Sequence, residues 1–178
     1  MKVYYDTTPA IAFIARKVRE HEYSPFNKDI EPFISFITLE EALHVLFSKE
    51  KYRDKWYPGK SKKEAYITFI QDLLSVYEVI TDNINSYEIL MLFLDIIKQL
   101  DREYSYIEKI KVHSDLPGFM DIIHFIFADR TCEILITTDR SFKKFEKVQT
   151  KKLKKIVILD EEELSIEKEI VLSNNSKQ

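Results

Sequence analysis

Glycine is nearly absent from this chain. The 178 residues include only 2 glycines, whereas an average protein has roughly 7%. Glycine supplies most of the turns that need a left-handed backbone, so a chain with so little of it has few special turns. Together with abundant lysine, glutamate and isoleucine, this scarcity predicts a helix-rich chain.

Cysteine is almost as rare, because Cys132 is the single example. One cysteine excludes an internal disulfide framework and any zinc site built from several cysteines. Cys132 stands beside the apolar run EILIT at 133–137. We therefore expect a buried, unreactive thiol rather than a nucleophile.

Long apolar runs and a strong net charge are also missing. The most apolar run, ILMLFLDII at 89–97, is far shorter than the ~20 residues of a membrane span. The opening MKVYYDTTPA contains an acidic residue at position 6 and lacks the pattern of a secretory signal peptide. The net charge of −3 creates no global field that attracts nucleic acid. These features predict a soluble, cytoplasmic protein with no membrane partner.

Short apolar segments typical of strands alternate along the chain with longer segments that have helical spacing. With 45% hydrophobic residues, we expect one domain at 1–160 and an acidic, polar tail at 161–178. Such alternation predicts an α/β, three-layer fold with a central, mostly parallel sheet of about five strands flanked by helices. The predicted strands are Lys2–Asp6, Phe33–Leu39, Val76–Thr81, Glu133–Thr137 and Lys155–Asp160. The first predicted helix begins with Thr8 as its cap and Pro9 at its first position. The other predicted helices span Glu40–Ser48, Ser61–Ser75 with a capping box, Ser86–Asp101, Leu116–Asp129 and Ser141–Lys147.

A basic and aromatic segment interrupts the alternation at 49–63. Its cations could follow a phosphate backbone, and its aromatic rings could stack on unpaired bases. The alternative is a solvated, packed excursion of the chain. The candidate RNA-binding residues are Lys49, Lys51, Arg53, Lys55, Trp56 and Lys60.

Acidic residues follow several of the predicted strands. Asp6 ends the first, Glu41 follows the second, and Asp139 follows the fourth. Asp121 lies in the helix before the fourth strand, whose start can approach the same edge of the sheet. Four close carboxylates would repel one another without a cation, and oxygen ligands suit Mg²⁺ or Mn²⁺. The pattern therefore predicts one metal site.

Each acidic residue also has a simpler explanation. Glu41 would be the third helical residue of a capping box that begins at Thr38. Asp6 and Asp139 would be turn residues after strands. Asp121 would hydrogen bond to His124, three residues further along the same helix face.

Four motifs, in order, resemble those of the PIN-domain ribonucleases. KVYYDTTPAIAFIA resembles the first strand and helix of that family, and FITLEEAL resembles its second motif, with Glu41 at the acidic position. GFMDIIHFIFA resembles its Asp-x-x-His helix, and ILITTDRSF resembles its last motif. The resemblance extends over most of the chain, from about residue 2 to residue 160.

The resemblance implies a metal-dependent endoribonuclease that cleaves single-stranded RNA through metal-activated water. The implied metal-binding and catalytic residues are Asp6, Glu41, Asp121 and Asp139, supported by Thr7, Thr137 and His124. Many small members are similar to VapC, the toxin of a toxin–antitoxin pair, and form homodimers. An antitoxin partner and a homodimer are therefore expected as well.

Two other functions fit the same fold. One is a PIN-like module that binds RNA or a protein without cleaving. An intact set of four acidic residues argues against it. The other is a DNA-directed relative that resembles flap nucleases, which would need a clamp or helical arch larger than this chain offers.

Overall fold

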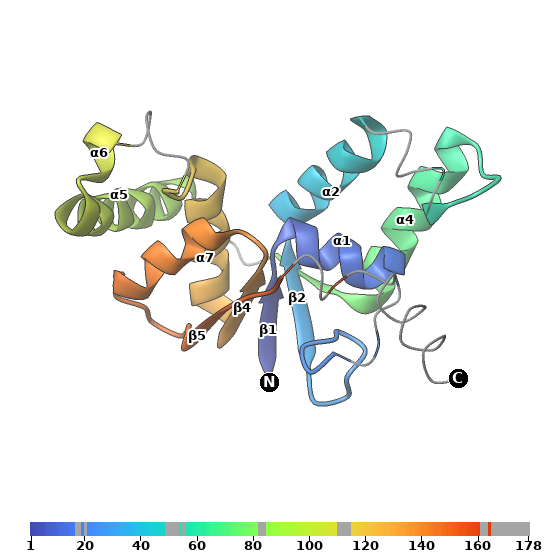
Figure 1. Ribbon diagram of the computed structural model, residues 1–178, viewed down its shortest axis with the longest axis horizontal. Coiled ribbons are helices and arrows are strands. Elements are labelled where there is room, and N and C mark those ends of the chain that lie inside the picture. Colours follow the sequence, from blue (N-terminus) through green and yellow to red (C-terminus); the bar gives the residue numbers. More distant parts are fainter. Residues whose placement is uncertain are drawn as a thin grey trace, which may run out of the picture.

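Five strands form one parallel sheet in the part of the chain that the computed structural model describes. Those residues are 1–16, 19, 21–48, 54, 56–81, 85–109, 115–160 and 164. The strands are β1 (Lys2–Tyr5), β2 (Glu31–Ser35), β3 (Glu78–Ile80), β4 (Ile134–Thr137) and β5 (Lys155–Ile158). They lie in the order β3-β2-β1-β4-β5, and every neighbouring pair is parallel. The predicted α/β fold with a parallel sheet flanked by helices is confirmed (Figure 1).

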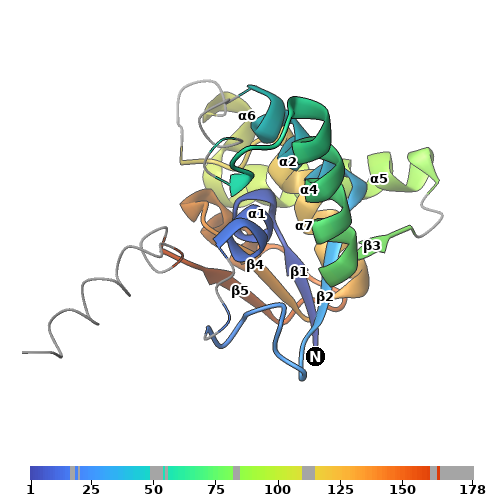
Figure 2. The same cartoon turned by 90° about the vertical axis from the view of Figure 1, so that its right-hand side faces the viewer.

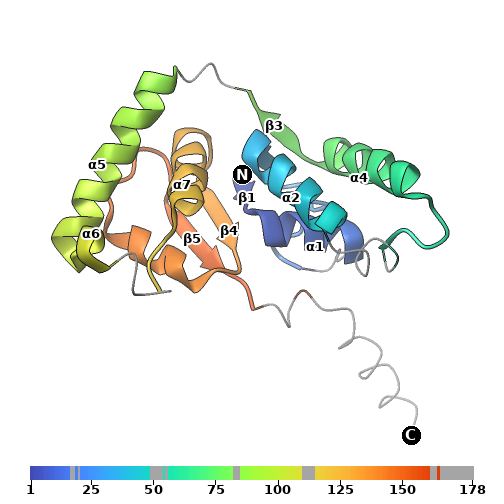
Figure 3. The same ribbon diagram turned by 90° about the horizontal axis from the view of Figure 1, so that it is seen from above.

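Helices cover both faces of the sheet. They are α1 (Thr7–Arg16), α2 (Phe36–Ser48), α4 (Lys62–Val76), α5 (Ser86–Tyr104), α6 (Tyr106–Lys109), α7 (Phe119–Thr131) and the 3₁₀ helix η1 (Arg140–Lys147). Seen from above, α1, α2 and α4 lie on one side of the strands, and α5, α6 and α7 lie on the other (Figure 3). Figure 2 shows α1, α2 and α4 in front of the sheet. Among the described residues, no helix has both the length and the apolar content needed to cross a membrane.

The alternation of side chains along the strands builds a core on each face. In β1, Val3 and Tyr5 pack into the core beneath α1, α2 and α4, whereas Tyr4 packs into the core beneath α5 and α7. All three side chains are fully buried. A parallel strand that is covered on both faces is buried at successive positions, which explains the run Val3-Tyr4-Tyr5 in β1.

Two predicted boundaries are wrong. The second strand ends at Ser35 rather than Leu39, and α2 begins at Phe36 rather than Glu40. Ser35 Oγ accepts a hydrogen bond from the backbone N–H of Thr38 at 3.3 Å, so Ser35 caps the helix. Thr38 is thus already helical, and Glu41 stands in the second turn of α2. The capping-box explanation of Glu41 is therefore wrong.

The first helix also starts earlier than expected. The predicted cap was Thr8, but α1 begins at Thr7, and the carbonyl oxygen of Asp6 accepts from the backbone N–H of Ala10 at 3.0 Å. By contrast, the capping box of α4 is confirmed, with Ser61 and Glu64 bonding each other's backbone N–H. Most of the predicted acidic tail at 161–178 lies outside the described residues.

Candidate metal centre

A cleft of about 580 Å³ opens at the carboxyl ends of β1 and β4. All four predicted carboxylates line it. The simpler explanations of these residues, as a helix cap, turn residues or a hydrogen-bond partner of His124, do not require the four side chains to meet. The lining residues are Asp6, Thr7, Thr8, Glu40, Glu41, His44, Val45, Asp121, His124, Thr138 and Asp139. In a parallel sheet, this edge is where ligands bind.

Asp6 reaches the cleft because it directly follows β1. Its Oδ2 accepts a hydrogen bond from Thr137 Oγ1 at 2.7 Å, and its Oδ1 accepts from the backbone N–H of Thr7 at 2.7 Å. Thr137 is the last residue of β4, the strand paired with β1. The carboxylate is therefore oriented by the neighbouring strand and by its own helix, and it is 14% exposed.

Glu41 enters the cleft from α2, on the far side of Asp6. The Thr7 hydroxyl donates a hydrogen bond to its Oε2, and His124 Nε2 lies 3.0 Å from the same oxygen. Partial burial alone would raise the pKa of Glu41, but the hydrogen bonds from His124 and Thr7 and the charge of His124 bring that pKa below its ordinary value. Glu41 is therefore held as a carboxylate.

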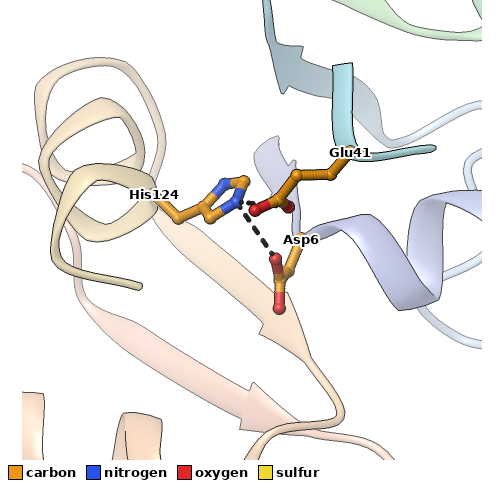
Figure 4. A group of neighbouring side chains, drawn as sticks. All are labelled: Asp6, Glu41 and His124. Carbon is orange, nitrogen blue, oxygen red and sulfur yellow. Dashed lines mark hydrogen bonds and ion pairs between the residues drawn. The ribbon is translucent and has the colours of Figure 1, made fainter. Parts of the chain in front are cut away.

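His124 comes from α7 and faces both carboxylates. Figure 4 shows Asp6, Glu41 and His124 pointing toward one another from three different elements. One ligand atom of each lies within 4.8 Å of the others, and His124 Nε2 is 3.6 Å from Asp6 Oδ1. The predicted hydrogen bond between Asp121 and His124 is wrong, because the His124 ring contacts Glu41 and Tyr4 instead.

A buried tyrosine holds the other side of the His124 ring. The Tyr4 hydroxyl lies 2.6 Å from His124 Nδ1, donates to Ser35 Oγ at 2.9 Å and lies 3.1 Å from Thr38 Oγ1. These contacts hold the ring in place, and Nε2 on its other side faces carboxylate oxygens, which accept from an N–H.

The His124 imidazole lies among the carboxylates of the cleft. Burial alone lowers the pKa of His124, yet the hydrogen bond to Glu41 and the charges of Asp6, Glu41 and Asp121 raise it above its ordinary value. The surrounding carboxylates therefore favour the protonated form of the ring, and Tyr4 contacts its other nitrogen.

Asp121 on α7 and Asp139 after β4 complete the acidic lining of the cleft. Asp121 Oδ2 accepts from the backbone N–H of Gly118 at 2.5 Å, and Asp139 Oδ1 accepts from the backbone N–H of Ser141 at 2.7 Å. Each therefore also stabilises the start of its helix. Burial, followed by the negative charges of Asp139 and Asp6, raises the pKa of Asp121.

The donor set fits a hard divalent cation. Carboxylate oxygens are the ligands that Mg²⁺ and Mn²⁺ prefer, and a cation would relieve the mutual repulsion that raises the pKa of Asp121. Asp6 and Glu41 each offer an oxygen within the 4.8 Å cluster, while Asp121 and Asp139 face the same cleft. The described residues thus form an acidic site that could bind a metal ion.

Two residues near the site were not singled out for it by the sequence. His44 is exposed and lines the cleft. Its position three residues after Glu41, on the same helix face, was the available signal. Tyr4 carried no such signal, because its contact with His124 joins residues 120 positions apart.

The predicted RNA-binding segment is only partly described. Lys49, Lys51, Arg53 and Lys55 lie outside the described residues. Trp56 is half-buried against the core beneath α4, and Lys60 Nζ donates to Thr68 Oγ1 at 3.1 Å. The packing of Trp56 agrees with the alternative of a packed excursion.

No protein-family model and no curated protein sequence matches this chain. Its structure is similar to a chain in the crystal structure of VapBC2 from Rickettsia felis bound to a DNA fragment from their promoter, with a TM-score of 0.55 and 17% sequence identity. The match covers 90% of this chain and 100% of the other. At this identity the similarity concerns the fold, and the chain therefore has a PIN-like α/β fold.

Proposed function

We propose that this protein is a metal-dependent endoribonuclease that cleaves single-stranded RNA. The observation that carries the proposal is the convergence of Asp6, Glu41, Asp121 and Asp139 on one cleft at the carboxyl edge of the sheet. Four carboxylates in one cleft repel one another without a cation, and the charges of Asp139 and Asp6 add to burial in raising the pKa of Asp121.

The four carboxylates would hold Mg²⁺ or Mn²⁺, which when bound supplies Lewis-acid chemistry for phosphodiester hydrolysis. The other side chains orient these ligands. Thr137 fixes Asp6, and Thr7 fixes Glu41, each through a hydroxyl that donates to the carboxylate. His124 donates to Glu41 from a buried position and so keeps one carboxylate oxygen turned inward. The open mouth of the cleft leaves room for a phosphate group.

We further propose that the protein is the toxin of a toxin–antitoxin pair, acts in the cytoplasm and forms a homodimer. The structural similarity to VapBC2, a protein solved with a promoter DNA fragment, supports this proposal. Light scattering of the purified protein checks the homodimer, because one chain has a mass of 21.2 kDa. A mass of one chain at micromolar concentration would contradict it.

The decisive experiment is cleavage of a mixed-sequence single-stranded RNA by the wild type, by Asp6→Asn and by Asp121→Asn. Reactions contain Mn²⁺ or EDTA. We expect cleavage only by the wild type with Mn²⁺, and a loss of at least about 100-fold in each variant, since each removes a ligand charge. The matched control is Asp29→Asn, which changes an exposed aspartate far from the cleft and should cleave normally.

Two results would contradict the proposal. Full activity of both folded variants would remove the carboxylates from the mechanism. If the wild type neither cleaves RNA nor binds Mn²⁺ in calorimetry, the alternative of a non-catalytic PIN-like binding module is favoured.

A further inference from the structure

A second cleft adjoins the acidic one. It has a volume of about 800 Å³ and lies between η1 and β5, the last strand of the sheet. Thr138 and Asp139 line both clefts, so the two are continuous through the turn after β4. The remaining lining residues are Arg140, Lys143, Glu146, Ile156, Ile158, Leu159 and Asp160.

The 3₁₀ geometry of η1 explains why its polar residues share one face. A 3₁₀ helix has three residues per turn, so side chains three apart stand in one row. Arg140, Lys143 and Glu146 have this spacing and all line the cleft. Phe142 and Phe145 lie on another face and are fully buried. The helix therefore presents two cations in a row, with Arg140 nearest the acidic cleft.

These two cations have no acidic partner in the part of the chain that the structure describes. Among the described residues, neither Arg140 nor Lys143 forms an ion pair, whereas the neighbouring Lys144 lies 3.8 Å from Asp115. Both side chains are exposed. Three acidic residues also line this cleft, namely Asp139 at the shared turn, Glu146 one turn beyond Lys143, and Asp160 after β5.

The dimensions and the floor of the cleft suit a nucleotide chain. Three residues of a 3₁₀ helix rise about 6 Å, which is comparable to the separation of neighbouring phosphates in an extended strand. Ile156 and Ile158 point to the same side of β5, are partly exposed and form an apolar floor. A groove whose cations follow the phosphate backbone is one component of sites that bind single strands.

We propose that this second cleft holds the substrate strand beside the phosphate that is cleaved, with Arg140 and Lys143 contacting the next two phosphates. The inference rests on the proposed function and adds a substrate requirement to it. The preferred substrate is then a single-stranded RNA that extends at least two phosphates beyond the cleaved bond on one side.

Binding of a fluorescent five-nucleotide RNA tests the proposal by anisotropy. The buffer contains Ca²⁺ in place of Mn²⁺, and a gel verifies that the RNA stays intact. The test variant is Arg140→Gln/Lys143→Gln, and the matched control is Lys98→Gln/Arg102→Gln, which removes two exposed cations from α5. We expect about 10-fold weaker binding by the test variant and a salt slope that is smaller by about 1.4, because each lost phosphate contact contributes about 0.7 for single strands.

A dinucleotide serves as the second probe, and it should bind equally to the wild type and to both variants. The proposal is overturned if the test and control variants bind the five-nucleotide RNA alike, or if the wild type binds it no better than the dinucleotide. Failure of the proposed function looks different, since the wild type would then not cleave with Mn²⁺ although five-nucleotide binding still depends on Arg140 and Lys143.

Discussion

The Tyr4 hydroxyl connects the buried polar side chains beneath the candidate metal centre. It contacts Ser35, Thr38 and His124, and all four side chains are buried. Buried polar groups are costly when they lose their partners. Tyr4 therefore affects both the stability of the protein and the orientation of the His124 ring.

Replacing Tyr4 with phenylalanine should lower the free energy of unfolding by about 1–3 kcal/mol, because His124 Nδ1 and Ser35 Oγ are left without their partner. Urea unfolding measures this change. The matched control is Tyr87→Phe, since Tyr87 is 67% exposed and its loss should change stability by less than about 0.5 kcal/mol. Equal stability of the Tyr4 variant and the wild type would mean that the buried network contributes nothing.

At the scale of one element, α4 is a helix whose start is determined locally. The capping box of Ser61 and Glu64 satisfies two backbone N–H groups, and Ser61 Oγ also donates to Glu64 Oε2 at 2.6 Å. Ala65, Phe69 and Leu73 then pack into the core at helical spacing. Cap and apolar stripe are both visible in the sequence, so this helix was predicted nearly to its ends.

The substitution Ser61→Ala should lower the free energy of unfolding by about 1 kcal/mol, since the first turn of α4 loses its side-chain cap. Chemical denaturation followed by circular dichroism measures it. Ser86→Ala is the control, because Ser86 begins α5 but the cap of that helix is Asn85. If both variants lose the same stability, the effect comes from serine removal in general and not from the cap.

At the scale of the whole molecule, the candidate metal centre joins both halves of the fold. Asp6 directly follows the central strand β1, Glu41 belongs to α2 in the helix layer on one face, and Asp121 belongs to α7 in the layer on the other (Figure 3). An ion that binds all three elements in the folded state has no comparable site in the unfolded chain. Its binding free energy therefore adds to the stability of the whole protein.

Adding Mn²⁺ at about 100 times its dissociation constant should stabilise the wild type by about 2.7 kcal/mol and raise its melting temperature. Thermal unfolding with Mn²⁺ and with EDTA checks this expectation. Asp6→Asn should lose most of the shift, whereas Asp29→Asn should keep it. A shift of equal size in all three proteins would indicate that Mn²⁺ binds elsewhere.

The sequence by itself determined the features that depend on neighbouring residues. Alternating apolar segments predicted the parallel α/β sheet, and the Ser61 cap predicted the start of α4. The acidic residues after β1 and β4 pointed to the carboxyl edge because successive parallel strands end there. Such patterns operate over a few residues, where chain connectivity alone sets the geometry.

Only the tertiary structure decided which side chains meet in the cleft. The partners of His124 are Tyr4 and Glu41, which lie 120 and 83 positions away, rather than Asp121, three positions away. Sheet pairing and helix packing create these contacts between distant segments, so no local pattern in the sequence encodes them.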